Sequence, residues 1–314
     1  MPGTLRGLLV ASTLGVLVGF ALCGSVAARP PKVPARDIPQ SEQDVAVAAI
    51  ESLGGRVTFD DSSPERPATG VTLFGPHFND DHLVHVKMLT SLRPLDLTNS
   101  KVTDAGLANL KGLTELQTLD LTNTLVTDAG LKHLQGMTSL QSLRLYGTKV
   151  SDAGLVHLKG LRHLEMLNLD LTEVSDAGLA HLKGLTSLET LSIFLLQVTD
   201  AGLVHLKGLT KLQRLNLGGT QVTDAGLVHL KGLSLKRLDL TYTKVTGAGL
   251  AHVERLTSLE TLAFGYTTIT DPSLEHLFGL TKLQTLYLTN TKVTGAGVKE
   301  LRRALPKCNT DIAN

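Results

Sequence analysis

Leucine alternates with polar residues over short stretches and then recurs at a spacing of three, and this change of period repeats along most of the chain. In residues 116–122 (LQTLDLT), Leu119 and Leu121 alternate with polar residues, as expected for a strand with one buried face. Leu131 and Leu134 then lie three apart, as on one face of a helix. The pattern therefore predicts a strand followed by a short helix.

The residues around that helix indicate where it begins and ends. Thr127 and Asp128 precede it, and side-chain oxygens of this kind cap helix N-termini. Aspartate is also favoured there by the helix dipole. Gly136 follows the last leucine and is expected to end the helix. We therefore expect the aspartate of each unit to be a helix N-cap contributing about 1 kcal/mol.

The same unit recurs every 24 residues. VTDAGLVHLKGL occurs without change at 198–209 and at 222–233. One unit, containing GLSLKRLDL, is a residue shorter than the others. Ten units can be aligned on the aspartate or the glycine that replaces it: Asp80, Asp104, Asp128, Asp152, Asp176, Asp200, Asp224, Gly247, Asp271 and Gly295. A single unit cannot bury its leucines alone, so the units are expected to stack.

The order L-x-x-L-x-L-x-x-T-x-V-T-D-A-G-L-x-x-L resembles the leucine-rich repeat of the ribonuclease-inhibitor-like, cysteine-containing class, with Thr where Asn or Cys usually stands. It is most similar to exported bacterial proteins with VTDAGLxxLKGL units. The resemblance implies an α/β leucine-rich repeat solenoid of about ten 24-residue repeats and a role in protein interaction. Strands stack about 4.8 Å apart and helices about 8–10 Å apart, so we expect a horseshoe with a concave parallel β-sheet and convex short helices.

A column of threonines follows the strands and is expected to satisfy backbone groups of the turn, with Leu196 breaking it. Its members are Thr124, Thr148, Thr172, Thr220, Thr243, Thr267 and Thr291.

The N-terminal segment differs from the repeats. Residues 1–28 contain one basic residue, an apolar run and small residues where a signal peptidase cuts, so they predict an export signal, with an uncleaved membrane anchor as the alternative. Residues 29–40 are a Pro-rich linker. We further expect an N-terminal cap over 41–79, repeats over 80–305 and a C-terminal tail or cap over 306–314. The protein is expected in the periplasm, in the cell envelope or outside the cell.

Composition excludes several classes of function. The formal net charge is +1 and the basic residues carry no interleaved aromatics, so nucleic-acid binding is not expected. The two cysteines, Cys23 and Cys308, cannot build a disulfide framework or a Cys-rich zinc site. No phosphate-binding glycine loop, nucleophile elbow or zinc signature occurs. We therefore expect no enzyme activity, no cofactor and no metal.

Histidine recurs five residues after the aligned aspartate in eight units, beside a column of lysines. A catalytic residue is normally needed once, so the histidines are interpreted as a solvated outer surface copied by duplication. The alternative is a ladder that responds to pH or metal. The histidine positions are His85, His133, His157, His181, His205, His229, His252 and His276.

The outward strand positions, in contrast, differ from unit to unit, and all four tyrosines of the chain fall in them. Tyr and Arg dominate binding hot spots, and Tyr tolerates a wet surface until a partner covers it. The alternative is drift on a tolerant surface, since aromatics suit strands. The candidate partner-binding residues are Arg144, Tyr146, Asp170, Leu171, Phe194, Leu195, Arg214, Arg237, Asp239, Tyr242, Tyr266 and Tyr287.

Together these patterns predict a non-enzymatic scaffold that binds a protein or peptide on its concave face. The tyrosines and Phe194 would be anchors, and the arginines would bind acidic groups. A glycan-binding protein and a mainly structural protein of the cell envelope are the alternatives. Membrane contact is expected only if the N-terminal segment stays uncleaved, and the sequence leaves the oligomeric state open.

Overall fold

Each repeat contributes one three-residue strand with a buried central residue. The computed structural model describes residues 41–312, so the predicted export signal or anchor and the Pro-rich linker lie outside the described residues. Within them, twelve strands form one sheet in chain order. The strands are β1 (Arg56–Phe59), β2 (Ala68–Thr72), β3 (Pro94–Asp96), β4 (Thr118–Asp120), β5 (Ser142–Arg144), β6 (Met166–Asn168), β7 (Thr190–Ser192), β8 (Arg214–Asn216), β9 (Arg237–Asp239), β10 (Thr261–Ala263), β11 (Thr285–Tyr287) and β12 (Asn309–Asp311).

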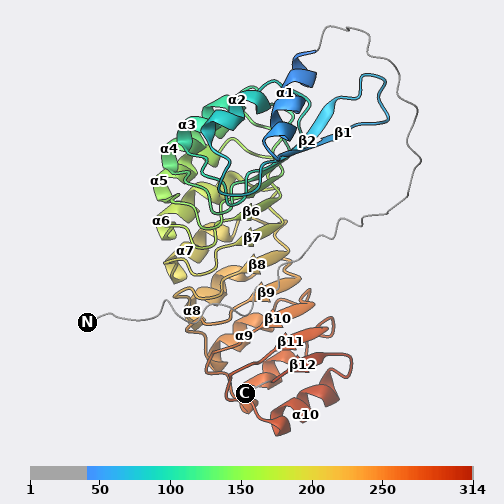
Figure 1. Ribbon diagram of the computed structural model, residues 1–314. Helices are drawn as coiled ribbons and strands as arrows, with labels where there is room; N and C mark the ends of the chain where they lie inside the picture. The colour runs from blue at the N-terminus through green and yellow to red at the C-terminus, as the bar shows by residue number, and fades with distance from the viewer. Residues whose placement is uncertain (1–40, 313–314) are drawn as a thin grey trace, which may run out of the picture. The chain divides into compact units, whose positions relative to one another are not determined.

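From β2 to β12 all neighbours are parallel, and only β1 pairs with β2 in the antiparallel sense. The register places equivalent residues of successive repeats side by side, as Leu119 beside Leu143 shows. Figure 1 shows these strands along one side of the repeats and the helices along the other.

Between the longer terminal helices α1 and α10, of 11 and 10 residues, the α-helices are single turns, most of them followed by a 3₁₀ turn. The α-helices are α1 (Glu42–Ser52), α2 (Leu83–Val86), α3 (Asp104–Leu107), α4 (Asp128–Leu131), α5 (Asp152–Leu155), α6 (Asp176–Leu179), α7 (Asp200–Leu203), α8 (Asp224–Leu227), α9 (Leu250–Val253) and α10 (Gly295–Ala304). The 3₁₀ turns are η1 (Asp80–His82), η2 (Ala108–Leu110), η3 (Lys132–Leu134), η4 (Val156–Leu158), η5 (Ala180–Gly184), η6 (Val204–Leu206), η7 (Val228–Leu230), η8 (Gly247–Gly249) and η9 (Asp271–Leu277).

The leucines of strands and helices meet in one continuous core. Leu119, Leu121, Leu131 and Leu134 are all fully buried, and the equivalent residues of the other repeats are buried with them. The predicted alternation is therefore confirmed, since the polar residues between the strand leucines stay half-exposed.

The prediction for the aspartate column was wrong in its detail. The helix N-cap is the hydroxyl before it: Thr127 Oγ1 accepts the N–H of Ala129 at 3.3 Å. Asp128 lies one residue later and bonds to the next repeat instead. Its two carboxylate oxygens accept the N–H of Ser151 at 2.7 Å and the Ser151 hydroxyl at 2.6 Å. We call such a pair of bonds an Asp rung.

Asp rungs join eight pairs of neighbouring repeats in the described chain. They run from Asp80 to Thr103, Asp104 to Thr127, Asp128 to Ser151, Asp152 to Ser175, Asp176 to Thr199, Asp200 to Thr223, Asp224 to Thr246 and Asp271 to Thr294. Sequence reasoning missed them because a carboxylate at this helix position suits a cap equally well.

The glycine of each DAG triplet follows from the Asp rung. A Cβ added at Gly130 would collide with the Asp104 carboxylate, so a side chain there would displace the rung. Where Gly247 replaces the aspartate, the glycine of the next repeat is replaced by Ser273. A Cβ at Gly247 would lie 2.7 Å from the Ser273 Cβ, so the serine fills the space that a carboxylate occupies elsewhere.

The threonine column behaves as predicted. Thr124 Oγ1 donates to the Leu121 carbonyl at 2.8 Å, and the other six threonines repeat this bond. Leu196, which interrupts the column, is buried in the core. Ser100 takes the same place in an earlier repeat, and its buried hydroxyl has no partner in the described part of the chain.

The terminal segments of the described chain contain α1 and β1 before the repeats and α10 and β12 at the C-terminal end. Ser41 caps α1 and β1 follows as the RVTF strand. Pro306 follows the end of α10, and the sequence did not indicate β12, which pairs with β11. Cys308 is buried and unpaired, and burial raises the pKa of its thiol.

Candidate functional site

The candidate site is the surface formed by the outward side chains of β3–β11 and by the two outward residues that follow each strand. We call it the strand face. All twelve predicted partner-binding residues lie on it, because the strands keep one register and the outward positions therefore form straight columns.

The last of these columns has a left-handed backbone in every repeat. Its residues have φ between +53° and +70°: Asn99, Asn123, Gly147, Leu171, Leu195, Gly219, Tyr242, Tyr266 and Asn290. From Asn99 to Tyr266, their N–H groups donate to a carbonyl of the next repeat and extend the sheet beyond the strand. Asn and Gly tolerate this conformation, whereas other residues raise the energy by roughly 1–2 kcal/mol each.

Four of the nine positions therefore carry side chains that the backbone disfavours. They form two pairs in neighbouring repeats, Leu171 with Leu195 and Tyr242 with Tyr266. Leu171, Tyr242 and Tyr266 are 37%, 51% and 46% exposed, so core packing does not account for them. Strained residues of this kind cluster at functional sites. The sequence signal was the loss of Asn or Gly from this column, which could not be understood before the φ angles were known.

Leu171, Phe194 and Leu195 form the apolar part of the strand face. Phe194 and Leu195 lean over the next repeat, where Gly218 and Gly219 make room for them: a Cβ at Gly218 would lie 2.9 Å from the Phe194 ring. Because Gly218 and Gly219 have no side chains, they leave the space that the Phe194 and Leu195 side chains occupy.

Asp170 lies beneath this apolar part and is not available as an exposed anchor. It is buried, and its carboxylate accepts the Phe194 N–H at 2.7 Å and the Asn168 side-chain amide at 3.0 Å. Burial raises the pKa of the Asp170 carboxyl, and hydrogen bonds from Ser192, Phe194 and Asn168 oppose part of that rise. Asp170 was predicted to be a binding residue; in the structure its carboxylate holds the backbone of Phe194.

Tyr242 and Tyr266 stack on each other. Their ring centroids are 4.0 Å apart and the planes are inclined by 13°. Burial against its surroundings, together with the neighbouring hydroxyl of Tyr266, raises the pKa of Tyr242 to about 12. The Tyr242 phenol is therefore neutral at physiological pH. Tyr146 and Tyr287 are half-buried, and neither joins this stack within the described residues.

The three arginines differ in their surroundings. Arg144 forms an ion pair with Asp120, at 3.1 Å between Nη1 and Oδ2. Arg214 and Arg237 are exposed and lie directly beside each other in the register of β8 and β9. Asp239 accepts the Thr241 N–H at 2.8 Å, and among residues 41–312 neither Arg214 nor Arg237 has a carboxylate within ion-pair distance.

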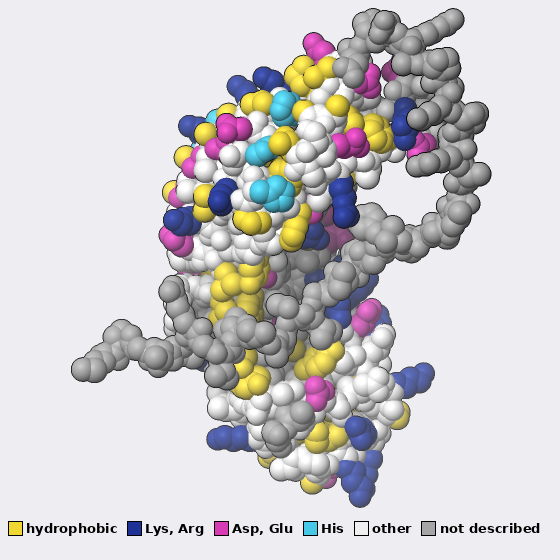
Figure 2. All heavy atoms as spheres, viewed as in Figure 1, with side chains coloured by type: hydrophobic (Ala, Val, Ile, Leu, Met, Phe, Trp, Pro, Cys, Tyr) yellow, Lys and Arg dark blue, Asp and Glu magenta, His cyan; other side chains and the backbone are white. Residues whose placement is uncertain are grey.

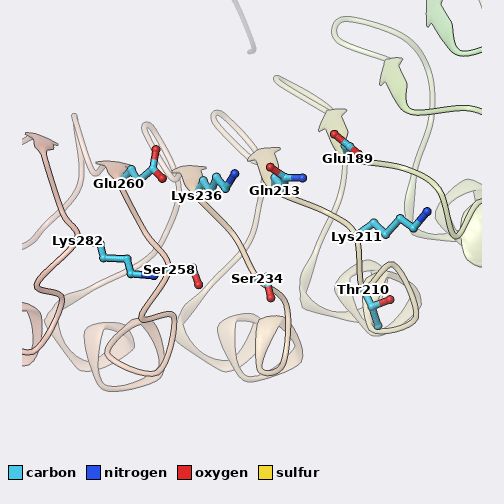
Figure 3. Close-up of a pocket in the computed structure, with 9 residues that line it drawn as sticks. All are labelled: Glu189, Thr210, Lys211, Gln213, Ser234, Lys236, Ser258, Glu260 and Lys282. Carbon is cyan, nitrogen blue, oxygen red and sulfur yellow. The ribbon is translucent and has the colours of Figure 1, made fainter.

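A shallow pocket of about 450 Å³ lies where the strands begin, and two of its lining residues, Gln213 and Lys236, directly precede Arg214 and Arg237 in the chain. Figure 3 shows its side chains coming from the strand starts and from the loops that precede them. The shortened repeat contributes Ser234 and Lys236 to it. The lining residues are Glu189, Thr210, Lys211, Gln213, Ser234, Lys236, Ser258, Glu260 and Lys282.

The histidine column lies on the helix side, as predicted, but it is half-buried rather than fully solvated. Figure 2 shows several histidine side chains one below another over the N-terminal repeats. The Nδ1 atoms of His205 and His229 are buried without a partner in the described chain, and burial lowers the pKa of His205. Within residues 41–312, no three His, Cys, Asp or Glu side chains come together as a metal site. In that same range no helix is long and apolar enough to cross a membrane.

Comparisons with known proteins agree with this architecture. A family model described as "Leucine-rich repeat region" matches residues 76–310. Internalin C2 of Listeria monocytogenes str. 4b F2365 is 27% identical with a TM-score of 0.51, over 65% of this chain and 84% of that one. A leucine-rich repeat protein of Leptospira interrogans is 23% identical with a TM-score of 0.54, over 73% of this chain and 62% of that one. No curated protein matches the sequence significantly. The predicted leucine-rich repeat solenoid is therefore confirmed.

Proposed function

Because the chain belongs to the leucine-rich repeat family, we propose that it is a non-enzymatic scaffold that binds a protein or peptide partner on its strand face. The observation that supports this most is the left-handed column. Four positions there carry exposed or half-exposed Leu and Tyr side chains, where Asn or Gly would cost less energy. Residues that weaken the free protein are retained where they are needed for another purpose.

The anchors of the proposed site are two groups of side chains. The first is the apolar group of Leu171, Phe194 and Leu195, and the second is the stack of Tyr242 on Tyr266. Aromatic and apolar side chains that are preformed on a rigid sheet lose little conformational entropy when a partner covers them. A stacked array of repeats supplies that rigidity, since each strand from β2 to β11 is hydrogen-bonded to two neighbours.

We also propose that the protein is exported and belongs to the ribonuclease-inhibitor-like, cysteine-containing subclass in an exported bacterial form. The apolar N-terminal segment with its small residues supports export, and the VTDAGLxxLKGL units support the subclass. Under this proposal the partner is a protein of the cell envelope or its surroundings.

The experiment is a comparison of baits. Immobilised protein is incubated with envelope extract beside the variants Leu171→Asn/Leu195→Asn and Tyr242→Asn/Tyr266→Asn, which keep the left-handed backbone. A helix-side control, Val204→Ser/Val228→Ser, removes comparably exposed apolar side chains (41% and 44%). We expect the strand-face variants to lose a protein that the control retains. Equal capture by all four baits would contradict the proposal, and selective capture of polysaccharide instead would favour glycan binding.

A further inference from the structure

Resting on the proposed function, we propose that the partner presents an acidic peptide segment. Its carboxylates contact Arg214 and Arg237, and an apolar side chain about five residues away covers Tyr242 and Tyr266. Three observations support an acidic peptide: the positive charge of this part of the strand face, the spacing between the arginines and the stacked tyrosines, and the half-buried side chains between them.

Arg214 and Arg237 place two positive charges side by side on the strand face. Arg214 and Arg237 are partners in the register of β8 and β9, and like charges at directly opposed positions destabilise a sheet. Both side chains are exposed, and the described residues offer no ion pair to either. Arg144 shows the contrasting case, since Asp120 already neutralises it. A partner carboxylate would relieve the repulsion and could form a bidentate bond with the guanidinium.

The charges around the arginines add to this positive field. The pocket at the strand starts contributes Lys211, Lys236 and Lys282, and it also contains Glu189 and Glu260. Asp239 follows Arg237 on the same outward face, so five basic groups stand against three acidic ones. Figure 3 shows the lysines reaching from loops and strand starts of separate repeats around the shortened unit. The excess is positive although the whole chain is nearly neutral at +1.

The distance between the two groups suits an extended peptide. Tyr242 follows Arg237 by five residues, which in a strand-like backbone corresponds to about 16 Å. In the repeat of Arg237, the outward positions between it and Tyr242 are Asp239 and Thr241, both half-buried, so no fully exposed side chain of that repeat separates Arg237 from the tyrosine stack. A segment of about five extended residues therefore reaches from one group to the other. An aliphatic or aromatic side chain at its far end can pack on the stacked rings.

The probe is a random twelve-residue peptide library displayed on phage and panned on the immobilised protein. Enriched peptides are synthesised with a fluorophore, and their dissociation constants are measured by anisotropy. The variants are Arg214→Gln/Arg237→Gln and Tyr242→Asn/Tyr266→Asn. The matched control is Lys207→Gln/Lys231→Gln, which removes the same charge from exposed helix-side positions of the two neighbouring repeats that begin with β7 and β8.

We expect enriched peptides to combine Asp or Glu with an apolar residue four to six positions away. The arginine variant should weaken binding at least about tenfold, and the lysine control should change it by less than about twofold. The inference is overturned by enrichment of uncharged or basic peptides, by equal effects of the two charge variants, or by failure to enrich any peptide. If the tyrosine variant loses the envelope partner and the arginine variant keeps it, the acidic segment is wrong and the proposed function stands. If both variants keep the envelope partner, the acidic segment and the proposed function are both wrong.

Discussion

The Asp rungs give a prediction that can be worked from the structure. Replacing Asp152 with Ala removes two hydrogen bonds to Ser175, one from its N–H at 2.7 Å and one from its hydroxyl at 2.6 Å. Hydrogen bonds to a charged group contribute roughly 1.5–3 kcal/mol each, and the lower end applies because both residues are half-buried. The free energy of unfolding should therefore fall by about 3 kcal/mol.

Asp152→Asn separates the rung from other effects of the substitution. The Asn oxygen can still accept the Ser175 N–H and its amide can donate to the hydroxyl, so the loss should be only about 1 kcal/mol. Glu115→Ala is the control, because that carboxylate is exposed and the described residues give it no hydrogen bond. Its effect should stay within about 0.5 kcal/mol.

Urea unfolding followed by circular dichroism measures these differences, and hydrogen exchange of the Ser175 amide locates them. In a repeat array each repeat contacts its neighbours, so Asp152→Ala should also raise exchange near that junction first. If Asp152→Ala were as stable as the Glu115→Ala control, or if the Ser175 amide kept its protection, the bridging role of the carboxylate would be refuted.

Three further predictions concern the left-handed column, the junction without an Asp rung and the buried carboxylate. Leu171→Asn should raise the free energy of unfolding by about 1 kcal/mol, because Asn tolerates the left-handed backbone better than Leu, and it should weaken partner binding. A loss of stability in the same urea assay would contradict the strain argument. Gly247→Asp and Ser273→Gly should each destabilise the protein or change its stability little when made alone. The double variant should be more stable than the unmodified protein, because a new Asp rung can form to Thr270. Simple additivity of the two substitutions in a double-mutant cycle would argue against this new rung. Because burial raises the pKa of Asp170, its carboxyl binds a proton more tightly in the folded state than in the unfolded state. The free energy of unfolding, relative to that of Asp170→Asn, should therefore fall as pH rises from the ordinary Asp range through the raised pKa. A difference between the two proteins that does not change with pH across that window would exclude the shift.

The sequence predicts the repeat and its two faces because strands and helices bury leucines at different, recognisable spacings. Leu119 and Leu121 alternate and Leu131 and Leu134 lie three apart, and a strand followed by a helical turn buries all four. The threonine hydroxyls were predictable for a similar reason, since their carbonyl acceptors lie within the same turn.

Contacts between repeats were harder to predict. The partner of Asp128 is Ser151, 23 residues later, and only the stacked structure brings the two together. A pairing signal does exist in the sequence, because the aspartate is lost at Gly247 where the following glycine becomes Ser273. The strained column was also hidden, since a leucine or tyrosine in it looks like any other surface residue until its φ angle is known.

The most direct test of the central claim uses the partner captured by the bait comparison. Its dissociation constant is measured for the unmodified protein, for Tyr242→Asn/Tyr266→Asn and for the helix-side control Val204→Ser/Val228→Ser. Binding on the strand face predicts that the tyrosine variant is weaker by at least about tenfold, because a stacked aromatic pair at an interface is a typical hot spot, while the control is unchanged. An unchanged tyrosine variant together with a weakened control would place the binding surface on the helix side and contradict the account.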